Sequence, residues 1–225
     1  MLSDLFRDDD IGFFSDDQFK PRLKTSELVV RRIYLLGRII SRIFKENNLP
    51  YWVTAGTLLG CVRHKGLIPW DDDIDISIME THEQKFVQMK DVFEKEGLRL
   101  IETHFGYRLF HKQESDPNLG IPFCDVIIMR HNVENGIIEL KHQSARDLWE
   151  NEFYLPEEVE LFQEMIYGDF TFSAPTDPLP FLFRCYGDDV LKTGWSQTYS
   201  HEINCAIESV VVETPNGFEP AKPFQ

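Results

Sequence analysis

The chain has 225 residues, 42% of them hydrophobic and 13% aromatic, a composition typical of one globular domain with its own core. Its net charge of −15 excludes a general attraction to nucleic acid or to an anionic membrane. A phosphate-bearing substrate would therefore need a bound metal ion or locally placed Arg and Lys. Solubility alone also accounts for such an acidic chain.

The N-terminal sequence gives no sign of a secretory leader. Its acidic start, MLSDLFRDDDIGFF, lacks the apolar stretch of a signal peptide, and no apolar run of 18 residues follows elsewhere. These features predict a cytoplasmic protein without a transmembrane segment. The Golgi lumen would be expected only for a chain trimmed from a longer, anchored protein.

Cysteine spacing predicts reduced thiols rather than disulfides or a zinc site. No two cysteines have C-x-x-C spacing, and none lies at zinc-finger distance from a histidine. We expect most of them to be buried as small hydrophobic residues: Cys61, Cys124, Cys185 and Cys205.

The first quarter of the chain predicts an arm followed by one long helix. Residues 1–24 mix Asp with Phe and Ile, and we expect them to lie on the surface through their aromatic side chains. Apolar residues over 28–44 recur at helical spacing, and Thr25 or Ser26 can cap that helix. The following pattern predicts a short strand over 51–55, a turn opened by Gly56 and a short helix over 57–64.

From residue 73 onward, helical and strand patterns alternate. Thr81 and Gln84 have the spacing of a capping box, which predicts a helix from Thr81 to about residue 95. Glycines after Asn135 and Tyr167 predict two hairpin turns. Strands are expected over 73–79, 98–103, 107–112, 121–130 and 137–142, then a hairpin over 159–175, a short helix over 177–187 and an irregular tail from 213. The fold class is therefore α/β or α+β, a mixed sheet flanked by helices with a C-terminal hairpin and helix.

Two aspartates of the segment DDDIDISIM share one face of a predicted strand. Asp73 and Asp75 are two residues apart, so their side chains point the same way, while the intervening isoleucines face the core. Such a pair can hold Mg²⁺ or Mn²⁺, which prefer oxygen ligands. A solvated acidic loop is the alternative interpretation. An EF-hand loop starting at Asp71 is excluded, because its positions 6 and 12 would be Ile76 and His82 instead of Gly and Glu.

A further aspartate interrupts the apolar strand IPFCDVIIMR. Cys124 and Val126 lie on one face of this strand and Asp125 on the other. An unpaired carboxylate in such surroundings is expensive to bury. Asp125 either completes a metal site with Asp73 and Asp75 or is simply a hydrogen-bonded residue near a strand end.

The segment GTLLGCVRH is a candidate phosphate-binding turn. It is not a P-loop, because the G-K-[ST] ending is missing. Gly56 and Gly60 would still let backbone N–H groups approach a phosphate, although these two glycines alone are better explained by an ordinary turn. Arg63 is suited to a bidentate phosphate contact. Trp70 is either a wall for a base or substrate or a core residue.

The stretch GTLLGCVRHKGLIPWDDDIDI resembles the signature of the LicD family, which includes fukutin and the fukutin-related protein and belongs to the nucleotidyltransferase-fold superfamily. That superfamily combines a Gly-Ser/Thr turn, two aspartates on the next strand and a third on a later strand. The matching residues, in order, are Gly56, Thr57, Asp73, Asp75 and Asp125. The resemblance covers roughly residues 25–195, which we take as the catalytic domain, with a tail over 196–225. The zinc-binding cysteines of the fukutin-related protein have no counterpart, so no zinc is implied.

The resemblance implies a metal-dependent phosphotransferase. It would move a phospho-alcohol, such as phosphocholine or ribitol phosphate, from a CDP-linked donor to a glycan hydroxyl. By this analogy Asp73, Asp75 and Asp125 are catalytic and bind Mg²⁺ or Mn²⁺, with Asp71 as a ligand or an outer group. Asp125 would complete the metal shell or deprotonate the acceptor hydroxyl. The implied donor-binding residues are Gly56, Thr57, Gly60, Arg63 and Trp70. A nucleotidyltransferase that releases pyrophosphate, and a silent nucleotide- or glycan-binding module, are the alternatives.

Overall fold

The computed structural model of the chain describes residues 23–112, 122–197, 199–200, 205–214 and 217–222. Of residues 199–200 and 205–206, only the backbone is described. Almost all of the predicted surface arm and the side chain of Cys205 lie outside these ranges, so expectations about them remain predictions. Cys61, Cys124 and Cys185 are free thiols, as expected, and the first two are buried.

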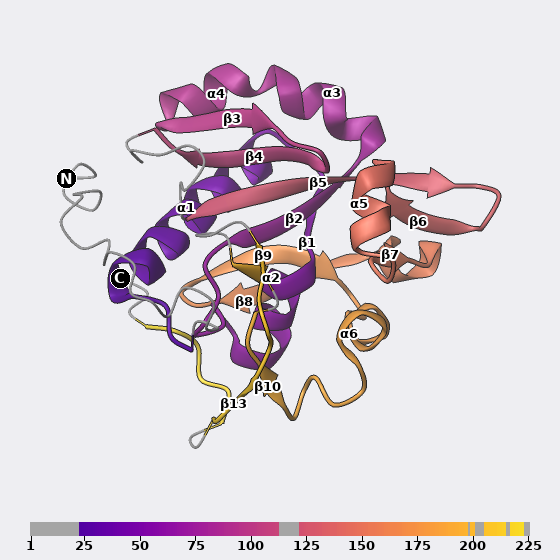
Figure 1. Cartoon of the computed structure of the whole chain (residues 1–225). Coiled ribbons are helices and arrows are strands. Elements are labelled where there is room, and N and C mark those ends of the chain that lie inside the picture. The colour runs from indigo at the N-terminus through magenta and orange to yellow at the C-terminus, as the bar shows by residue number, and fades with distance from the viewer. Residues whose placement is uncertain (1–22, 113–121, 198, 201–204, 215–216, 223–225) are drawn as a thin grey trace.

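The centre of the molecule is a mixed sheet of seven strands in the described part of the chain (Figure 1). Five strands follow the order β1-β2-β5-β4-β3, while β6 pairs with the far end of β5 and with β7. Only β2 and β5 run parallel, and every other neighbouring pair in this sheet is antiparallel. The strand bounds are β1 Trp52–Val53, β2 Ile74–Met79, β3 Leu98–Glu102, β4 Gly106–His111, β5 Phe123–Asn132, β6 Ile137–Leu140 and β7 Phe153–Tyr154.

Helices cover the sheet, with α3 and α4 running beside β3 and β4 and α1 crossing behind the strands (Figure 1). The predicted mixed sheet with flanking helices is confirmed. In the described residues the helical segments are α1 Glu27–Glu46, α2 Ala55–Leu59, the π-helical turn η3 Gly60–His64, α3 Glu80–Gln88, α4 Lys90–Lys95, α5 Gln143–Leu148, the 3₁₀ turn η4 Pro156–Val159 and α6 Leu179–Tyr186. None of the described helices is both long and apolar enough to cross a membrane.

Strand alternation separates a core face from a polar face in β2. Ile74, Ile76 and Ile78 are fully buried, and Ile74 reaches the surface of α1 at Gly37. The aspartates between and before these residues consequently point to the opposite side of the sheet. The sequence prediction about this strand is confirmed, and Ser26 rather than Thr25 caps α1 through its hydroxyl.

The capping box predicted at Thr81 and Gln84 is wrong. Helix α3 begins at Glu80, directly after β2, and its first turn has no side-chain cap. The helix is placed by Phe86, which is fully buried against Phe44, Phe93 and Tyr107. Burial of this aromatic side chain outweighs a capping hydrogen bond in setting where the helix starts.

The C-terminal third contains a hairpin that packs against β1 and α1, a helix that packs against α2, and short strand pairs. The predicted hairpin turn at Gly168-Asp169 and the predicted short helix are confirmed as β8–β9 and α6. The proposed domain boundary after residue 195 stays a prediction, but the β10–β13 pair crosses it. The additional strands are β8 Phe162–Tyr167, β9 Phe170–Pro175, β10 Gly194–Trp195, β11 Tyr199–Ser200, β12 Cys205–Ala206 and β13 Val211–Val212.

Candidate functional site

The sheet register brings two predicted aspartates to adjacent positions. Asp75 on β2 lies directly opposite Asp125 on β5 in the parallel pair. Arg108 on β4 lies opposite Asp125 on the other side. Because residues in register share a face, these three side chains form a row across the polar face of the sheet.

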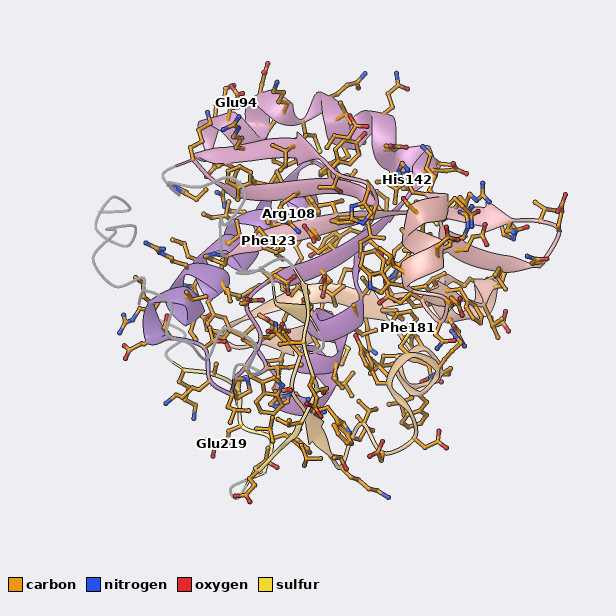
Figure 2. The ribbon with its side chains drawn as sticks, viewed as in Figure 1. Glu94, Arg108, Phe123, His142, Phe181 and Glu219 are labelled. Atoms are coloured by element: carbon orange, nitrogen blue, oxygen red, sulfur yellow. The ribbon has the colours of Figure 1, made fainter. Side chains whose placement is uncertain are left out.

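The Asp125 carboxylate is bound by the guanidinium of Arg108. The Nε of Arg108 donates to Oδ1 at 2.6 Å and Nη2 donates to Oδ2 at 2.8 Å. The same guanidinium stacks on Phe123, with Cζ 3.5 Å from the ring centroid, and the two residues lie close together in the centre of Figure 2. Burial lowers the pKa of Arg108, but the hydrogen bonds and charge of Asp125 outweigh it, so the pKa is raised.

Arg108 is a site residue that the sequence analysis missed. It lies in the predicted strand YRLFHK, between apolar residues, where a lone arginine signals a partner on the polar face. The partner could not be identified without the strand register.

A compact acidic group lies immediately before β2. One carboxylate oxygen from each of Asp71, Asp72 and Asp73 lies within 4.8 Å of the others, and this is the one group among the described residues with possible metal-binding geometry. Gln197 donates from Nε2 to Oδ1 of Asp71 at 3.1 Å and to Oδ1 of Asp72 at 3.0 Å. Asp72 and Gln197 were not predicted. The predicted metal ligands were Asp73, Asp75 and Asp125. The sheet aligns Asp75 with Asp125, but of these three only Asp73 belongs to the compact group.

Asp73, which directly precedes β2, and Asp75, which lies within it, are unfavourable as free anions. Burial, followed by the charges of Asp75, Asp71, Asp72 and Asp125, raises the pKa of Asp73 well above its usual range. Burial, followed by the charges of Asp71 and Asp125, likewise raises the pKa of Asp75. A hard divalent cation would relieve this repulsion, and the set of carboxylate oxygens suits Mg²⁺ or Mn²⁺.

Helix α2 supports the acidic group from the side of β1. The backbone N–H of Asp75 donates to Oγ1 of Thr57 at 2.8 Å. At Gly56, a Cβ atom would lie 2.9 Å from Oδ2 of Asp71 and 3.5 Å from Oδ2 of Asp75. The structure therefore brings Gly56 and Thr57 to the carboxylates, and the missing side chain of Gly56 leaves room beside them.

The structure places Gly60 and Arg63 in packing contacts. A Cβ atom at Gly60 would lie 2.6 Å from the carbonyl oxygen of Gly66, so the two backbone segments are in close contact. Arg63 donates from Nη1 to the carbonyl oxygens of Val190 and Thr193 at 2.7 and 3.1 Å. Burial lowers the pKa of Arg63 to about 10. These contacts explain both residues without a phosphate, and their donor-binding role remains a prediction.

Trp70 lies in the core rather than on an open wall of the site. Its side chain is buried, and its indole N–H donates to the carbonyl oxygen of Trp195 at 2.8 Å. Its ring contacts His64 edge to face. The indole thus holds the β10 strand next to the loop that carries the aspartates.

Similarity to known proteins agrees with this arrangement. The family described as LicD/FKTN/FKRP, nucleotidyltransferase domain, matches residues 48–177, which include the acidic group, Asp125 and Arg108. An uncharacterised protein of Rickettsia typhi is 30% identical over 214 residues, which cover 93% of this chain and 64% of that protein. The chain therefore spans somewhat less than two thirds of the length of this relative.

Shorter matches join the chain to proteins with named activities. The lipopolysaccharide cholinephosphotransferase LicD of Haemophilus influenzae is 49% identical over 42 residues, 19% of this chain and 16% of that protein. The human ribitol 5-phosphate transferase FKRP is 33% identical over 54 residues, 24% of this chain and 11% of that protein. Among solved structures, the lincosamide adenylyltransferase LnuA bound to lincomycin aligns with a TM-score of 0.42 at 18% identity, covering 75% of this chain and 96% of that one.

Proposed function

This chain belongs to the LicD/FKTN/FKRP nucleotidyltransferase-domain family, and we propose that it is a metal-dependent transferase that moves a phospho-alcohol from a CDP-linked donor to a glycan hydroxyl. The activities of the LicD and FKRP relatives, one a cholinephosphotransferase and the other a ribitol 5-phosphate transferase, support a phospho-alcohol as the transferred group.

The observation that carries this proposal is the convergence of carboxylates at one edge of the polar face. Asp73 directly precedes β2, Asp75 lies two residues later on the same face, and Asp125 lies beside Asp75 on the parallel strand β5. Buried carboxylates this close together repel one another, and a bound cation would remove that repulsion. Their burial and mutual repulsion argue for a ligand-binding role over a solvated loop.

Asp73 and Asp75 would hold Mg²⁺ or Mn²⁺, with Asp71 or Asp72 adding a further oxygen. When bound, the cation would neutralise the charge of the donor diphosphate, which phosphoryl transfer requires more than covalent catalysis. Thr57 holds the backbone at Asp75, and Gly56 leaves space for the donor beside Asp71. The Arg108 ion pair keeps Asp125 in a fixed orientation next to Asp75.

Product analysis tests the proposal. The chain is incubated with Mn²⁺, methyl glycosides and either CDP-choline, CDP-ribitol or a nucleoside triphosphate. Metal-dependent release of CMP is the expected result. Pyrophosphate release would instead identify a nucleotidyltransferase, and absence of any product with a bound nucleotide would identify a binding module.

Matched variants connect the product to the site. The double variant Asp73→Asn/Asp75→Asn should release no CMP, whereas Asp91→Asn, on an exposed face of α4, should be as active as the wild type. Undiminished CMP release by the double variant would overturn the assignment of the site.

A further inference from the structure

Gln197 connects the C-terminal segment of the chain to the acidic group. Its Nε2 donates to Oδ1 of Asp71 at 3.1 Å and to Oδ1 of Asp72 at 3.0 Å. A side-chain amide carries two N–H donors, so one Gln can bind two carboxylates at once. The amide of Gln197 therefore joins two like-charged groups that repel each other.

Hydrogen bonds hold the backbone directly before Gln197. The backbone N–H of Ser196 donates to the carbonyl oxygen of Val210 at 2.9 Å, and the N–H of Val210 donates to Oγ of Ser196 at 2.9 Å. Oγ of Ser209 donates to the carbonyl oxygen of Ser196 at 2.8 Å. Ser196 is buried, so these contacts fix the point from which the Gln197 side chain starts.

Trp70 fixes the same segment relative to the aspartates. Its indole N–H donates to the carbonyl oxygen of Trp195 at 2.8 Å. A Cβ atom at Gly194 would lie 3.1 Å from the Trp70 ring, so the backbone of β10 packs directly on the indole. Because Trp70 immediately precedes Asp71 in the chain, this packing places Gln197 next to the acidic group.

The backbone of Asp71 is held by separate contacts. Oγ1 of Thr25 donates to the carbonyl oxygen of Asp71 at 2.6 Å, and the backbone N–H of Asp71 donates to the carbonyl oxygen of Ile68 at 2.9 Å. The Gln197 side chain thus spans two backbone segments that are each fixed by other hydrogen bonds. Its contact with the carboxylates is set by the fold.

The two oxygens of the Asp71 carboxylate face different partners. Oδ1 accepts hydrogen bonds from Gln197 and from the backbone N–H of Asp72, the latter at 3.1 Å. Oδ2 lies 2.9 Å from the position that a Cβ atom on Gly56 would occupy, and Oδ2 of Asp75 lies 3.5 Å from the same position. The hydrogen bonds at Oδ1 fix the rotation of the Asp71 carboxylate and so keep its other oxygen on the side of Asp75.

A neutral amide is the residue type that a cation site needs at this position. Hydrogen bonds to the ligands of a metal orient them, and an uncharged donor leaves their negative charge for the cation. A Lys would bind the same carboxylates more strongly, but its charge would compete with a metal ion. If Gln197 only tied the C-terminal segment to the loop, a cationic side chain would serve at least as well.

We propose that Gln197 is a positioning residue that assembles the acidic group for a divalent cation. Its amide holds the carboxylates of Asp71 and Asp72 in one orientation before the cation binds. The segment after β10 is then part of the cation-binding unit, although it lies beyond residue 177, where the match to the family ends. This inference rests on the metal-dependent function proposed above.

The test compares two substitutions of Gln197 with a matched control. Gln197→Met keeps the length of the side chain and removes both donors, whereas Gln197→Lys supplies donors together with a positive charge. The control is Gln163→Met. Gln163 on β8 also donates twice from Nε2, to the carbonyl oxygens of Pro175 and Thr176 at 3.2 and 2.8 Å. The measurements are Mn²⁺ affinity by calorimetry, thermal unfolding without metal, and CMP release over a series of Mn²⁺ concentrations.

For Gln197→Met we expect the Mn²⁺ affinity to fall about 10- to 100-fold, the usual effect of removing a group that orients metal ligands. At saturating Mn²⁺ its kcat should stay within about threefold of the wild type, because the carboxylates themselves remain. Gln163→Met loses the same number of amide hydrogen bonds and should bind Mn²⁺ as the wild type does.

Gln197→Lys separates positioning from stability. Its ammonium group would pair with the carboxylates, so without metal the variant should unfold at the same temperature as the wild type or a higher one. Its Mn²⁺ affinity should nevertheless fall at least about tenfold, because the charge is already neutralised. A purely structural contact would not make stability and metal affinity change in opposite directions.

The outcomes separate this inference from the function on which it rests. Wild-type Mn²⁺ affinity in Gln197→Met or in Gln197→Lys would overturn the role of Gln197 and leave the transfer function intact. An equal loss of affinity in Gln163→Met would overturn it too, because the effect would then be general. A wild-type protein that binds no Mn²⁺ would overturn both. If the wild type binds Mn²⁺ but turns over no CDP-linked donor, the proposed function is overturned, and the expected differences in affinity would still support the role of Gln197.

Discussion

Removal of the Arg108 guanidinium should destabilise the metal-free protein through Asp125. In the variant Arg108→Gln, the carboxylate of Asp125 stays in place beside Asp75 and loses the two hydrogen bonds that the guanidinium donates. The side chain of Asp125 is 10% exposed and that of Arg108 is 21% exposed, so little water can replace these hydrogen bonds.

The structure sets the expected size of this effect. Breaking a fully buried ion pair from one side costs about 3–5 kcal/mol. Because both side chains are partly accessible to water, we expect a loss somewhat below this range, about 2–3 kcal/mol. For a chain of this size, that loss corresponds to a Tm lower by about 4–12 °C. The guanidinium also stacks on the ring of Phe123, and removal of this cation–π interaction adds to the same change.

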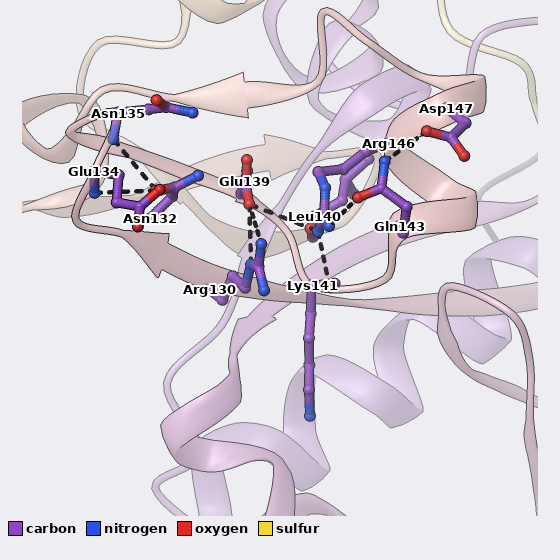
Figure 3. A network of polar contacts seen from close by, with 10 residues as sticks. All are labelled: Arg130, Asn132, Glu134, Asn135, Glu139, Leu140, Lys141, Gln143, Arg146 and Asp147. Carbon is purple, nitrogen blue, oxygen red and sulfur yellow. Dashed lines mark hydrogen bonds and ion pairs between the residues drawn. The ribbon is translucent and has the colours of Figure 1, made fainter.

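Two further variants isolate the contribution of the charge. Arg108→Gln/Asp125→Asn also removes the carboxylate charge that the guanidinium neutralised, so most of the stability should return. Arg130→Gln removes a similar ion pair from the same sheet, in which Arg130 Nη2 lies 2.6 Å from Oε1 of Glu139 (Figure 3). Glu139 keeps Arg146, whose Nη1 lies 3.6 Å away, and Arg130 is more exposed, so this control should lose about 1 kcal/mol or less.

The assay is urea unfolding of all variants in buffer with a chelator, followed by circular dichroism. The reasoning is refuted if Arg108→Gln unfolds at the same urea concentration as the wild type. It is also refuted if the double variant is no more stable than Arg108→Gln, because the loss would then come from packing and not from an uncompensated carboxylate.

Three other predictions concern the acidic group and the core beside it. Asp73→Asn/Asp75→Asn should lose Mn²⁺ binding in calorimetry yet unfold at the same or a higher temperature without metal, because the mutual repulsion of buried carboxylates is removed; retained Mn²⁺ affinity contradicts this. Gly56→Ala should weaken Mn²⁺ binding at least about tenfold, since its Cβ would lie 2.9 Å from Oδ2 of Asp71, and an unchanged affinity would show that this oxygen is not needed. His64 is buried with an unpaired Nε2, and burial, followed by the charge of Arg63, lowers its pKa to about 3. The unfolded chain therefore binds this proton first, and stability should fall by up to about 1.4 kcal/mol per pH unit as the pH drops from about 6.5 toward 3. A His64→Gln variant should show a flatter dependence in urea unfolding, and an identical slope would contradict the assignment.

Local sequence patterns determined most of the secondary structure and, within the site, the shared face of Asp73 and Asp75. Alternation in DDDIDISIM places Asp73 and Asp75 on the face opposite to the buried isoleucines, and this depends only on the two-residue period of a strand. The hairpin turn at Gly168-Asp169 is also local, because the glycine adopts a positive φ of 68° that few other residues tolerate. Such features follow from the chain within a few residues, so sequence analysis could find them.

Long-range pairing determined the rest. The register of β2 and β5 across about 50 intervening residues decides that Asp75 meets Asp125, and the antiparallel strand β4 decides that Arg108 binds the latter. Gln197 belongs to no local motif, and its position beside Asp71 and Asp72 depends on how the segment after β10 folds back onto the sheet. The burial that raises the pKa of Asp73 and of Asp75 exists only in the packed chain, because desolvation is a property of the surrounding residues and not of the sequence around a carboxylate.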